Sequence, residues 1–475
     1  MPRPRRALVR LAFLACTLAA AATARAQLPR IPQLSLPPLQ LPAVPLQLPA
    51  NVSPGSDIAA PPRADIELLD LQGQRKRRNL DKLRLYGDRI DTDTNGNLVV
   101  RYEIVAYLPS LALLDRMREL GFLVIRERQL NSLNSIAVVL RPANGAPTSD
   151  ALRRLLELFP DGAFDFNHLY NDSGASEGKR VARDTLRGSA VTHAAQPWPS
   201  LASAESAAVP AKDMRRIGLI DDGVDGGTEA LRDVRIHRDG CFGREMASAH
   251  GTAVASIMVG RTGKFNGAAP GIELYAADIY CGEPTGGSVD AIVGALAWMA
   301  DQRIPVVNVS LVGPANKVLE ATVRGMIQRG HQIVAAVGND GPAAPPLYPA
   351  AHPGVIGVTA VDAELRVLPE ASRGPQVSFA APGANMAAAK TSSGYTAVRG
   401  TSYAAPVVAG LLAQLMDEAS PAAAQQALTR LIGTATDLGP PGKDPIYGYG
   451  LVGKEIRTDP AQLNLADERS SFRTP

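Results

Sequence analysis

The sequence predicts an α/β fold in which helices cover both faces of a parallel sheet, preceded by a smaller α+β unit. From residue 214 onward, short apolar strands alternate with longer stretches of helical period, which is the pattern of a parallel sheet. Residues 97–170 instead follow the order β-α-β-β-α-β, which is typical of a ferredoxin-like fold. A chain of 475 residues is also long enough for two or more folded units.

The first 26 residues have the features of a secretory signal. Five arginines and no acidic residue lie in this stretch, an apolar run spans residues 11–22, and Ala-Arg-Ala precedes Gln27 as a cleavage site. A membrane anchor and lipidation at Cys16 are the alternatives, but the apolar run is short for a spanning helix. We therefore expect a secreted protein, extracellular or periplasmic, without stable insertion in a membrane.

Charge and cysteine content narrow the class of protein further. The net charge is +3, and because five positive charges lie in the predicted signal, the remainder carries −2. A near-neutral protein gives no indication of nucleic acid or an anionic membrane as a partner, and we expect a monomer. Cys241 and Cys281 remain after signal removal. In an oxidising compartment a disulfide is favoured over two free thiols.

The region before the parallel sheet divides into three parts. Residues 27–62 are rich in Pro and Leu, which predicts an extended linker. The α+β unit follows at 63–170, and its basic cluster at 75–78 is interpreted as a solvated helix face. Residues 171–212, rich in Ala, Ser and Gly, predict an exposed processing linker. Within the α+β unit we expect strands at 97–106, 122–126, 135–140 and 163–170, and helices at 111–120 and 150–158, the second capped by Thr148 or Ser149.

The predicted α/β domain spans residues 213–457 and is followed by a tail at 458–475. Its expected strands are 216–221, 273–279, 306–311, 332–337 and 354–361, and its expected helices are 251–259, 289–302, 318–330 and 401–416. In parallel sheets, binding sites form beyond the carboxyl ends of the strands. Asp221, Ser310 and Asn339 fall at or just after strand ends, so we expect them to share a cleft.

Four short segments of this domain supply the groups that acyl transfer by a serine requires. They are Ile-Asp-Asp-Gly around Asp221, His-Gly-Thr at His250, Val-Gly-Asn at Asn339 and Gly-Thr-Ser-Tyr-Ala-Ala-Pro around Ser402. Each segment alone is a weak signal, but their order and glycine settings are specific together. The order Asp, His, Ser is that of subtilisin, and residues 214–457 resemble the secreted serine proteases of the subtilase family, peptidase S8.

This resemblance implies a role for each of the four residues. Ser402 is the expected nucleophile, His250 the general base and later the acid, and Asp221 the carboxylate that orients the imidazole. Asn339 is the expected oxyanion donor. The resemblance also implies a subtilisin-like sheet and makes the preceding ferredoxin-like α+β unit an inhibitory propeptide. An unrelated binding module is the alternative for that unit.

The resemblance further implies that a peptide substrate adds as a strand to the edge of the cleft. The expected edge consists of Ser310, Leu311, Val312 and Gly313. Val312 stands where the family usually has Gly and should crowd the added strand, and Leu347 falls near the base of the primary pocket. Both add volume, which predicts a shallow pocket that prefers small residues such as Ala. Asp222 follows the catalytic aspartate, and we hypothesise that it lines the cleft edge and favours a cationic substrate residue.

The chain is thus predicted to be a secreted serine endopeptidase, made as a self-processed zymogen that its own propeptide inhibits. Polypeptides are the expected substrates. No cofactor or metal site is predicted, because residues 261–269 hold Asn266 and no carboxylate where many subtilases bind structural calcium. A degenerate subtilase acting as a non-catalytic binding scaffold is the main alternative, and an esterase with the same triad is another.

Overall fold

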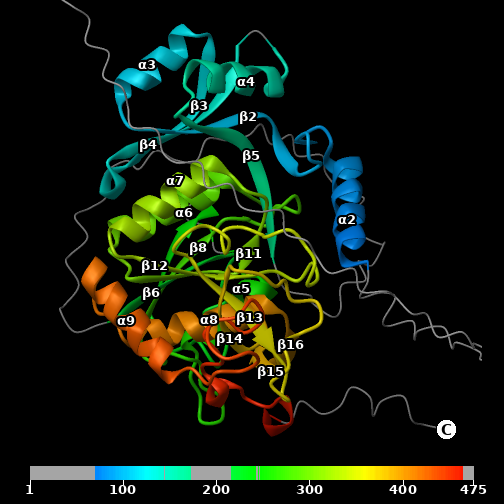
Figure 1. Ribbon diagram of the computed structural model, residues 1–475, viewed down its shortest axis with the longest axis vertical. Helices are drawn as coiled ribbons and strands as arrows, with labels where there is room; N and C mark the ends of the chain where they lie inside the picture. Colours follow the sequence, from blue (N-terminus) through cyan, green and yellow to red (C-terminus); the bar gives the residue numbers. More distant parts are fainter. Residues whose placement is uncertain (1–69, 144, 173–214, 242–243, 245, 464–475) are drawn as a thin grey trace, which may run out of the picture. The chain divides into compact units, whose positions relative to one another are not determined.

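The computed structural model describes residues 70–172 except 144, and residues 215–463 except 242, 243 and 245 (Figure 1). The predicted signal at 1–26, the Pro-rich linker at 27–62, nearly all of the predicted processing linker and most of the predicted tail lie outside the described residues. No described helix combines the length and the apolar character that crossing a bilayer requires.

The larger sheet consists of seven parallel strands. These are β6 (Arg216–Asp221), β7 (Ile236–Gly240), β8 (Glu273–Asp278), β10 (Val306–Val309), β12 (Gln332–Ala336), β13 (Ile356–Val361) and β14 (Val377–Pro382). Their order across the sheet is β14-β13-β12-β10-β6-β8-β7, and every neighbouring pair is parallel (Figure 1). Because β6, β10 and β12 are neighbours, their carboxyl ends meet at one place on the sheet edge.

Helices cover both faces of this sheet, as the sequence predicts. Helices α5 (Ala249–Val259) and α8 (Thr401–Ala413) pack on one face, and α6 (Val289–Asp301) and α7 (Lys317–Gln328) pack on the other. Successive strand residues therefore enter different cores: Leu219 of β6 belongs to the first and Ile220 to the second. Burial on both faces explains why central strands such as β6 contain continuous apolar runs. A further helix, α9 (Pro421–Thr434), contacts α8.

Polar side chains and one glycine fix where these helices begin. The Ser288 side chain accepts from the Ala291 amide at the start of α6, Asn316 caps α7, and Ser420 caps α9. These bonds satisfy amides that have no partner within the helix. Helix α8 begins after Gly400, whose φ of 136° strains any residue that has a Cβ.

The N-terminal region has the predicted ferredoxin-like order. It runs β2 (Leu98–Leu108), α3 (Leu111–Glu119), β3 (Phe122–Leu130), β4 (Ser135–Pro142), α4 (Thr148–Leu158) and β5 (Ala163–Asp172). The strands are antiparallel in the order β5-β2-β4-β3, and β1 (Ile90–Thr92) pairs with β2. One face packs against α3 and α4 through Ile104 and Leu114, while Val105 and Val139 on the other face join the core of α6 and α7.

Strand β5 continues this sheet into the C-terminal region. It pairs antiparallel with β11 (Leu311–Val312), where Asn171 lies opposite Val312 and Asp172 opposite Leu311. It also pairs antiparallel with β9 (Gly287–Ser288), where Leu169 lies opposite Ser288. The end of β5 therefore joins two short strands that belong to the α/β domain.

The structure departs from the predicted elements in several places. The predicted cap of α4 by Thr148 or Ser149 is wrong, because the helix begins after Pro147 without a side-chain cap. The basic cluster does lie on a helix, α2 (Leu71–Tyr86), but Arg75 forms an ion pair with Asp340 instead of facing solvent. Elements that the sequence did not predict include the antiparallel pair β15 (Ala384–Ala389) and β16 (Tyr395–Arg399) and the short helices η1 (Asn131–Leu133), η3 (Lys454–Ile456) and η4 (Pro460–Leu463).

The two cysteines of the described region form a disulfide, Cys241–Cys281, at a sequence separation of 40. This is the alternative that the sequence favours. The bond joins the end of β7 to the loop after β8, two strands that are neighbours in the sheet.

Candidate active site

Asp221 and His250 form a buried hydrogen-bonded pair. Strand β6 ends at Asp221, and its Oδ1 lies 2.7 Å from His250 Nδ1, near the start of α5. The two residues are 1% and 8% exposed. A carboxylate in this position keeps the imidazole proton on Nδ1 and leaves Nε2 as the acceptor. Among the described residues, His250 Nε2 is buried and has no hydrogen-bond partner.

The surroundings of His250 favour its protonated form. Burial opposes a charged imidazolium, but the Asp221 carboxylate and its hydrogen bond outweigh burial and raise the pKa of His250 above its usual value. Asp172 and Asp222 add to the same shift. These surroundings therefore stabilise the imidazolium that forms when His250 takes up a proton.

Ser402 occupies the first turn of α8 and is fully buried. Its backbone carbonyl accepts a hydrogen bond from Ser310 Oγ at 2.9 Å, and Ser310 Oγ itself accepts from Asn308 Nδ2 at 2.8 Å. The Tyr403 ring lies 5.4 Å from the His250 ring, measured between centroids. Ser402 Oγ has no partner among the described residues, so the hydroxyl is available to react.

Asn339 lies three residues beyond the end of β12 and contacts the start of α8. Its Oδ1 accepts a hydrogen bond from the Thr401 amide at 3.2 Å. The Gly338 amide donates to Thr401 Oγ1 at 3.2 Å. The side-chain oxygen of Asn339 thus already accepts a hydrogen bond. The side-chain nitrogen, Nδ2, is a buried donor that has no partner among the described residues. An oxyanion requires such a donor.

The predicted cleft edge is occupied by β5. Leu311 and Val312 are the two residues of β11 and lie opposite Asp172 and Asn171 of β5. The predicted crowding of a substrate strand by Val312 stays a prediction. Gly313 exchanges backbone hydrogen bonds with Tyr348 at 2.9 and 3.0 Å. A Cβ on Gly313 would lie 2.6 Å from the ring of Tyr170, so only glycine leaves room for that ring.

Leu347 is buried beside the loop that carries Asn339. A Cβ placed on Gly338 would come within 2.5 Å of the Leu347 side chain, which shows how closely the two residues pack. Leu347 therefore packs against the residue that precedes Asn339, and its predicted place at the base of the primary pocket stays a prediction.

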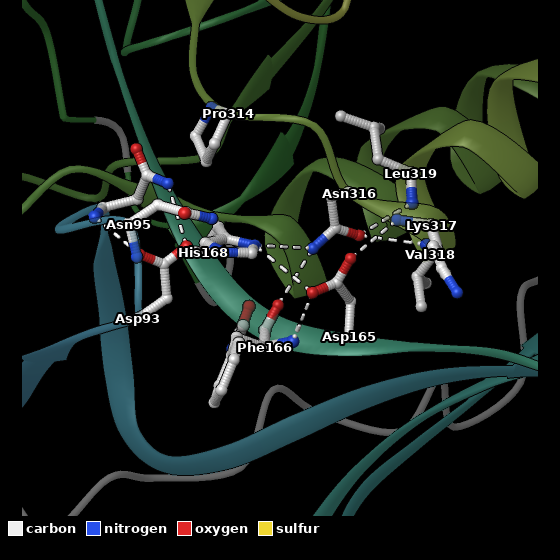
Figure 2. Close-up of polar contacts among 12 residues, drawn as sticks. Asp93, Asn95, Asp165, Phe166, His168, Pro314, Asn316, Lys317, Val318 and Leu319 are labelled. Atoms are coloured by element: carbon white, nitrogen blue, oxygen red, sulfur yellow. Dashed lines mark hydrogen bonds and ion pairs between the residues drawn. The ribbon is translucent and has the colours of Figure 1, made fainter. Parts of the chain in front are cut away.

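A second polar cluster holds β5 against the start of α7 (Figure 2). Asn316 Oδ1 accepts from the Val318 and Leu319 amides, so its Nδ2 donates to the Phe166 carbonyl and to His168 Nδ1, both at 2.9 Å. His168 Nε2 then donates to Asp93 Oδ2 at 3.2 Å. The side chains of Asn316, His168 and Asp93 are almost completely buried, and they tie β5 and the turn after β1 to the α/β domain.

Helix α2 makes polar contacts near the same cleft. Arg75 pairs with Asp340, which follows Asn339, and Lys82 donates to Asn171 Oδ1 and to the Thr285 carbonyl. No residue of α2 is fully buried, but Leu83 and Tyr86 pack against the apolar cluster of Ile90, Leu98 and Leu169. Polar contacts and apolar packing together hold the helix in place.

Asp222 faces helix α5. One carboxylate oxygen accepts from the Gly251 amide and the other from Ser248 Oγ. The hypothesis that Asp222 lines the cleft edge for a cationic substrate thus receives no support from its contacts, since both oxygens already have partners.

Two groups of side chains among the described residues are close enough to hold a metal ion. One is Asp221, Asp222 and His250, in which Asp221 already contacts His250 and both carboxylate oxygens of Asp222 accept hydrogen bonds from α5 and its N-cap. The other combines Asp278 with the two cysteines of the disulfide. The sulfurs of a disulfide are not thiolate ligands, so this second group does not indicate a metal site.

Comparison with known proteins decides the family. The model of the subtilase family, peptidase S8, matches residues 216–450. Subtilisin DY of Bacillus licheniformis is 31% identical over 255 residues, which cover 50% of this chain and 89% of that protein. Subtilisin Savinase of Lederbergia lenta is 34% identical over 214 residues, which cover 44% of this chain and 78% of that protein. The chain belongs to the subtilase family.

Membership makes this subtilase a subtilisin-like serine endopeptidase. The structure of fervidolysin from Fervidobacterium pennivorans, described as a keratinolytic enzyme related to subtilisin, superposes with a TM-score of 0.57 at 20% identity. The match covers 75% of this chain and 61% of that one, and it shows the fold.

The structure brings Asp221 to His250 and Asn339 to the start of α8, next to Ser402, and it adds residues that the sequence did not single out. Two of these residues were not predicted to be functional. Asn308 donates a hydrogen bond to Ser310, and the Thr401 amide donates one to Asn339. Thr401 lies within the Gly-Thr-Ser segment, so its position beside Ser402 was the available signal. Nothing in the sequence links Arg75 to Asp340, because 265 residues separate them.

Proposed function

We propose that Asp221, His250 and Ser402 are the catalytic triad of this subtilase and that Asn339 is its oxyanion donor. His250 Nε2 takes the proton from Ser402 Oγ as the oxygen attacks the peptide carbonyl, and then gives it to the leaving amine. Asn339 Nδ2 and the positive end of α8 stabilise the oxyanion. The observation that carries this proposal is that all three reacting groups, Nε2, Oγ and Nδ2, are buried without partners among the described residues. Buried polar groups without partners cost stability, so a catalytic role explains why they are kept.

We further propose that the predicted α+β unit is the inhibitory propeptide of a self-processed zymogen. Strand β5 pairs with β11, the edge to which an extended substrate would add, and so excludes other peptides. Its last residue, Asp172, is near enough to contribute to the raised pKa of His250. Strand β5 thus ends near His250, which supports cleavage within the predicted processing linker.

We also propose that the protein is secreted. One relative, the minor extracellular protease Epr of Bacillus subtilis, is 29% identical over 249 residues, which cover 50% of this chain and 37% of that protein. Together with the basic, apolar and Ala-Arg-Ala segments of residues 1–26, this supports export followed by removal of the signal.

Loss of the α2 contacts should speed the appearance of activity. In the double variant Arg75→Ala/Lys82→Ala, the ion pair with Asp340 and the hydrogen bonds to Asn171 and Thr285 disappear. Charged hydrogen bonds contribute about 1.5–3 kcal/mol each when partly buried, so we expect the lag before peptide hydrolysis to shorten by at least about threefold. The lag is measured on the full chain after refolding.

The matched control for this experiment is Lys76→Ala/Arg78→Ala, which removes two positive charges from exposed positions of the same helix. Its lag should equal that of the unmodified chain. Equal lags in both double variants would show that α2 takes no part in inhibition.

Peptide hydrolysis tests both the catalytic proposal and its predicted preference. Because Leu347 and Val312 are buried at the cleft and add volume, we expect kcat/KM to be highest for Ala before the cleaved bond and lower for Leu and Phe. Leu347→Ala should raise the Phe-to-Ala ratio of kcat/KM roughly tenfold, the scale of one or two buried methylenes. An enzyme equally active after Ala, Leu and Phe would contradict the preference, and no hydrolysis of any peptide would contradict the catalytic proposal.

A further inference from the structure

Helix α5 is capped by a carboxylate from another element. A serine at the N-cap position usually accepts a hydrogen bond from an amide of the first turn, but the Ser248 side chain makes no such bond. It donates to Asp222 Oδ2 instead, and the Gly251 amide donates to Asp222 Oδ1 at 2.5 Å. Asp222 thus takes the place of Ser248 as the cap.

The same residue is tied to the end of strand β6. The Asp222 amide donates to Asp221 Oδ1 at 2.8 Å, the oxygen that also contacts His250. The contact with α5 is close, since a Cβ on Gly251 would lie 2.3 Å from the Asp222 carbonyl. Asp222 therefore connects the strand that carries one triad member to the helix that carries another.

We propose that Asp222 is a positioning residue, which caps α5 from β6 and thereby holds His250 against Asp221. The inference rests on the catalytic roles proposed above for those two residues. A cap from Ser248 would satisfy the Gly251 amide equally well but would not join the helix to the strand. A negative group at a helix N-terminus is also stabilised by the helix dipole.

The charge of Asp222 acts separately from its hydrogen bonds. Burial and the neighbouring Asp221 carboxylate raise the pKa of Asp222 to about 7. Its negative charge contributes to the raised pKa of His250. The titratable groups that surround this part of the site are Asp172 on β5, Asp221 on β6, Asp278 at the end of β8, Tyr280 after β8, His250 on α5 and Tyr403 on α8. Amide and alanine substitutions separate the two effects.

Kinetics of three variants test the proposal. Asp222→Ala removes the cap and the charge, and should lower kcat roughly 10- to 100-fold with KM within about twofold, because displacement of a catalytic group lowers the rate more than binding. Asp222→Asn keeps an oxygen for the Gly251 amide, so kcat should stay within about threefold of the unmodified enzyme. Ser248→Ala keeps the bond to Gly251 and should resemble Asp222→Asn in kcat.

The pH profile gives a second readout. Without the negative charge of residue 222, the pKa of His250 falls, and the acid limb of kcat/KM should move to lower pH in Asp222→Asn. Selectivity for basic over neutral peptides should stay unchanged in all three variants. The proposal would be wrong if Asp222→Asn lost selectivity for basic peptides while kcat and the acid limb of the pH profile were unchanged. Asp222 would then face the substrate.

A titration that needs no activity separates this inference from the proposed function. In the uncut Ser402→Ala chain, NMR follows the imidazole of His250 with pH, and the added Asp222→Asn change should lower its pKa and leave the Nδ1 proton hydrogen-bonded to Asp221. Asp222→Ala should broaden or shift that proton signal. Identical His250 signals in all backgrounds would overturn the inference, whereas an inactive unmodified chain would overturn the proposed function alone.

Discussion

Replacement of Ser402 by alanine should lower kcat for peptide hydrolysis by about 10⁶-fold, the scale known for loss of the nucleophile in subtilisin. Without Oγ there is no acyl-enzyme route, and only the oxyanion site and substrate binding remain. Because Ser402 Oγ has no partner among the described residues, its removal should not destabilise the fold. The measurement is steady-state hydrolysis of a peptide that has Ala immediately before the cleaved bond. Thermal unfolding of both proteins checks that the variant is folded.

A fluorophosphonate that labels reactive serines gives an independent check. The unmodified enzyme should be labelled at Ser402 alone, and the alanine variant should not be labelled. Activity or labelling that survives in Ser402→Ala would show that another residue is the nucleophile.

Replacement of Asn339 by alanine should lower kcat by about 10²–10³-fold and leave KM nearly unchanged. The Nδ2 donor has no partner in the structure, so its hydrogen bond is gained only when the oxyanion forms. Asn339→Asp is the matched variant, since it keeps an oxygen for the Thr401 amide but removes the donor. Both variants should therefore lose similar amounts of kcat.

An effect on KM instead of kcat would contradict this role for Asn339. So would a loss in Asn339→Ala that Asn339→Asp largely restores, because it would point to the Thr401 contact as the part of Asn339 that matters.

Much of the fold can be predicted from local patterns. Strands such as β6 and β12 are buried on both faces, so each contains an unbroken apolar run. The Ser288 and Asn316 caps mark helix starts. A strand at the edge of the sheet is harder to predict from the sequence. Strand β7 carries charged residues, with Ile236 and Gly240 at its ends, so it lacks an apolar run. Its pairing with β8 depends on the fold as a whole. The sequence also did not reveal that α4 lacks a side-chain cap. Thr148 and Ser149 are residue types that usually cap helices, but Pro147 occupies the N-cap position.

The site was predictable to the extent that its chemistry resides in short motifs. Asp221, His250, Asn339 and Ser402 are each marked by neighbouring residues, and parallel topology places them at one edge. Contacts across long sequence separations were not predictable. The carboxylate of Asp222 could face a substrate or a helix, and only the position of α5 relative to β6 decides in favour of the helix.

The intact mass and N-terminal sequence of the secreted protein test the central claim most directly, with the unmodified chain beside Ser402→Ala. The account predicts that the unmodified protein is shortened and starts between residues 173 and 215, while the variant still starts at Gln27. Cleavage of both chains at the same bond, or of neither, would contradict a self-processed zymogen whose nucleophile is Ser402.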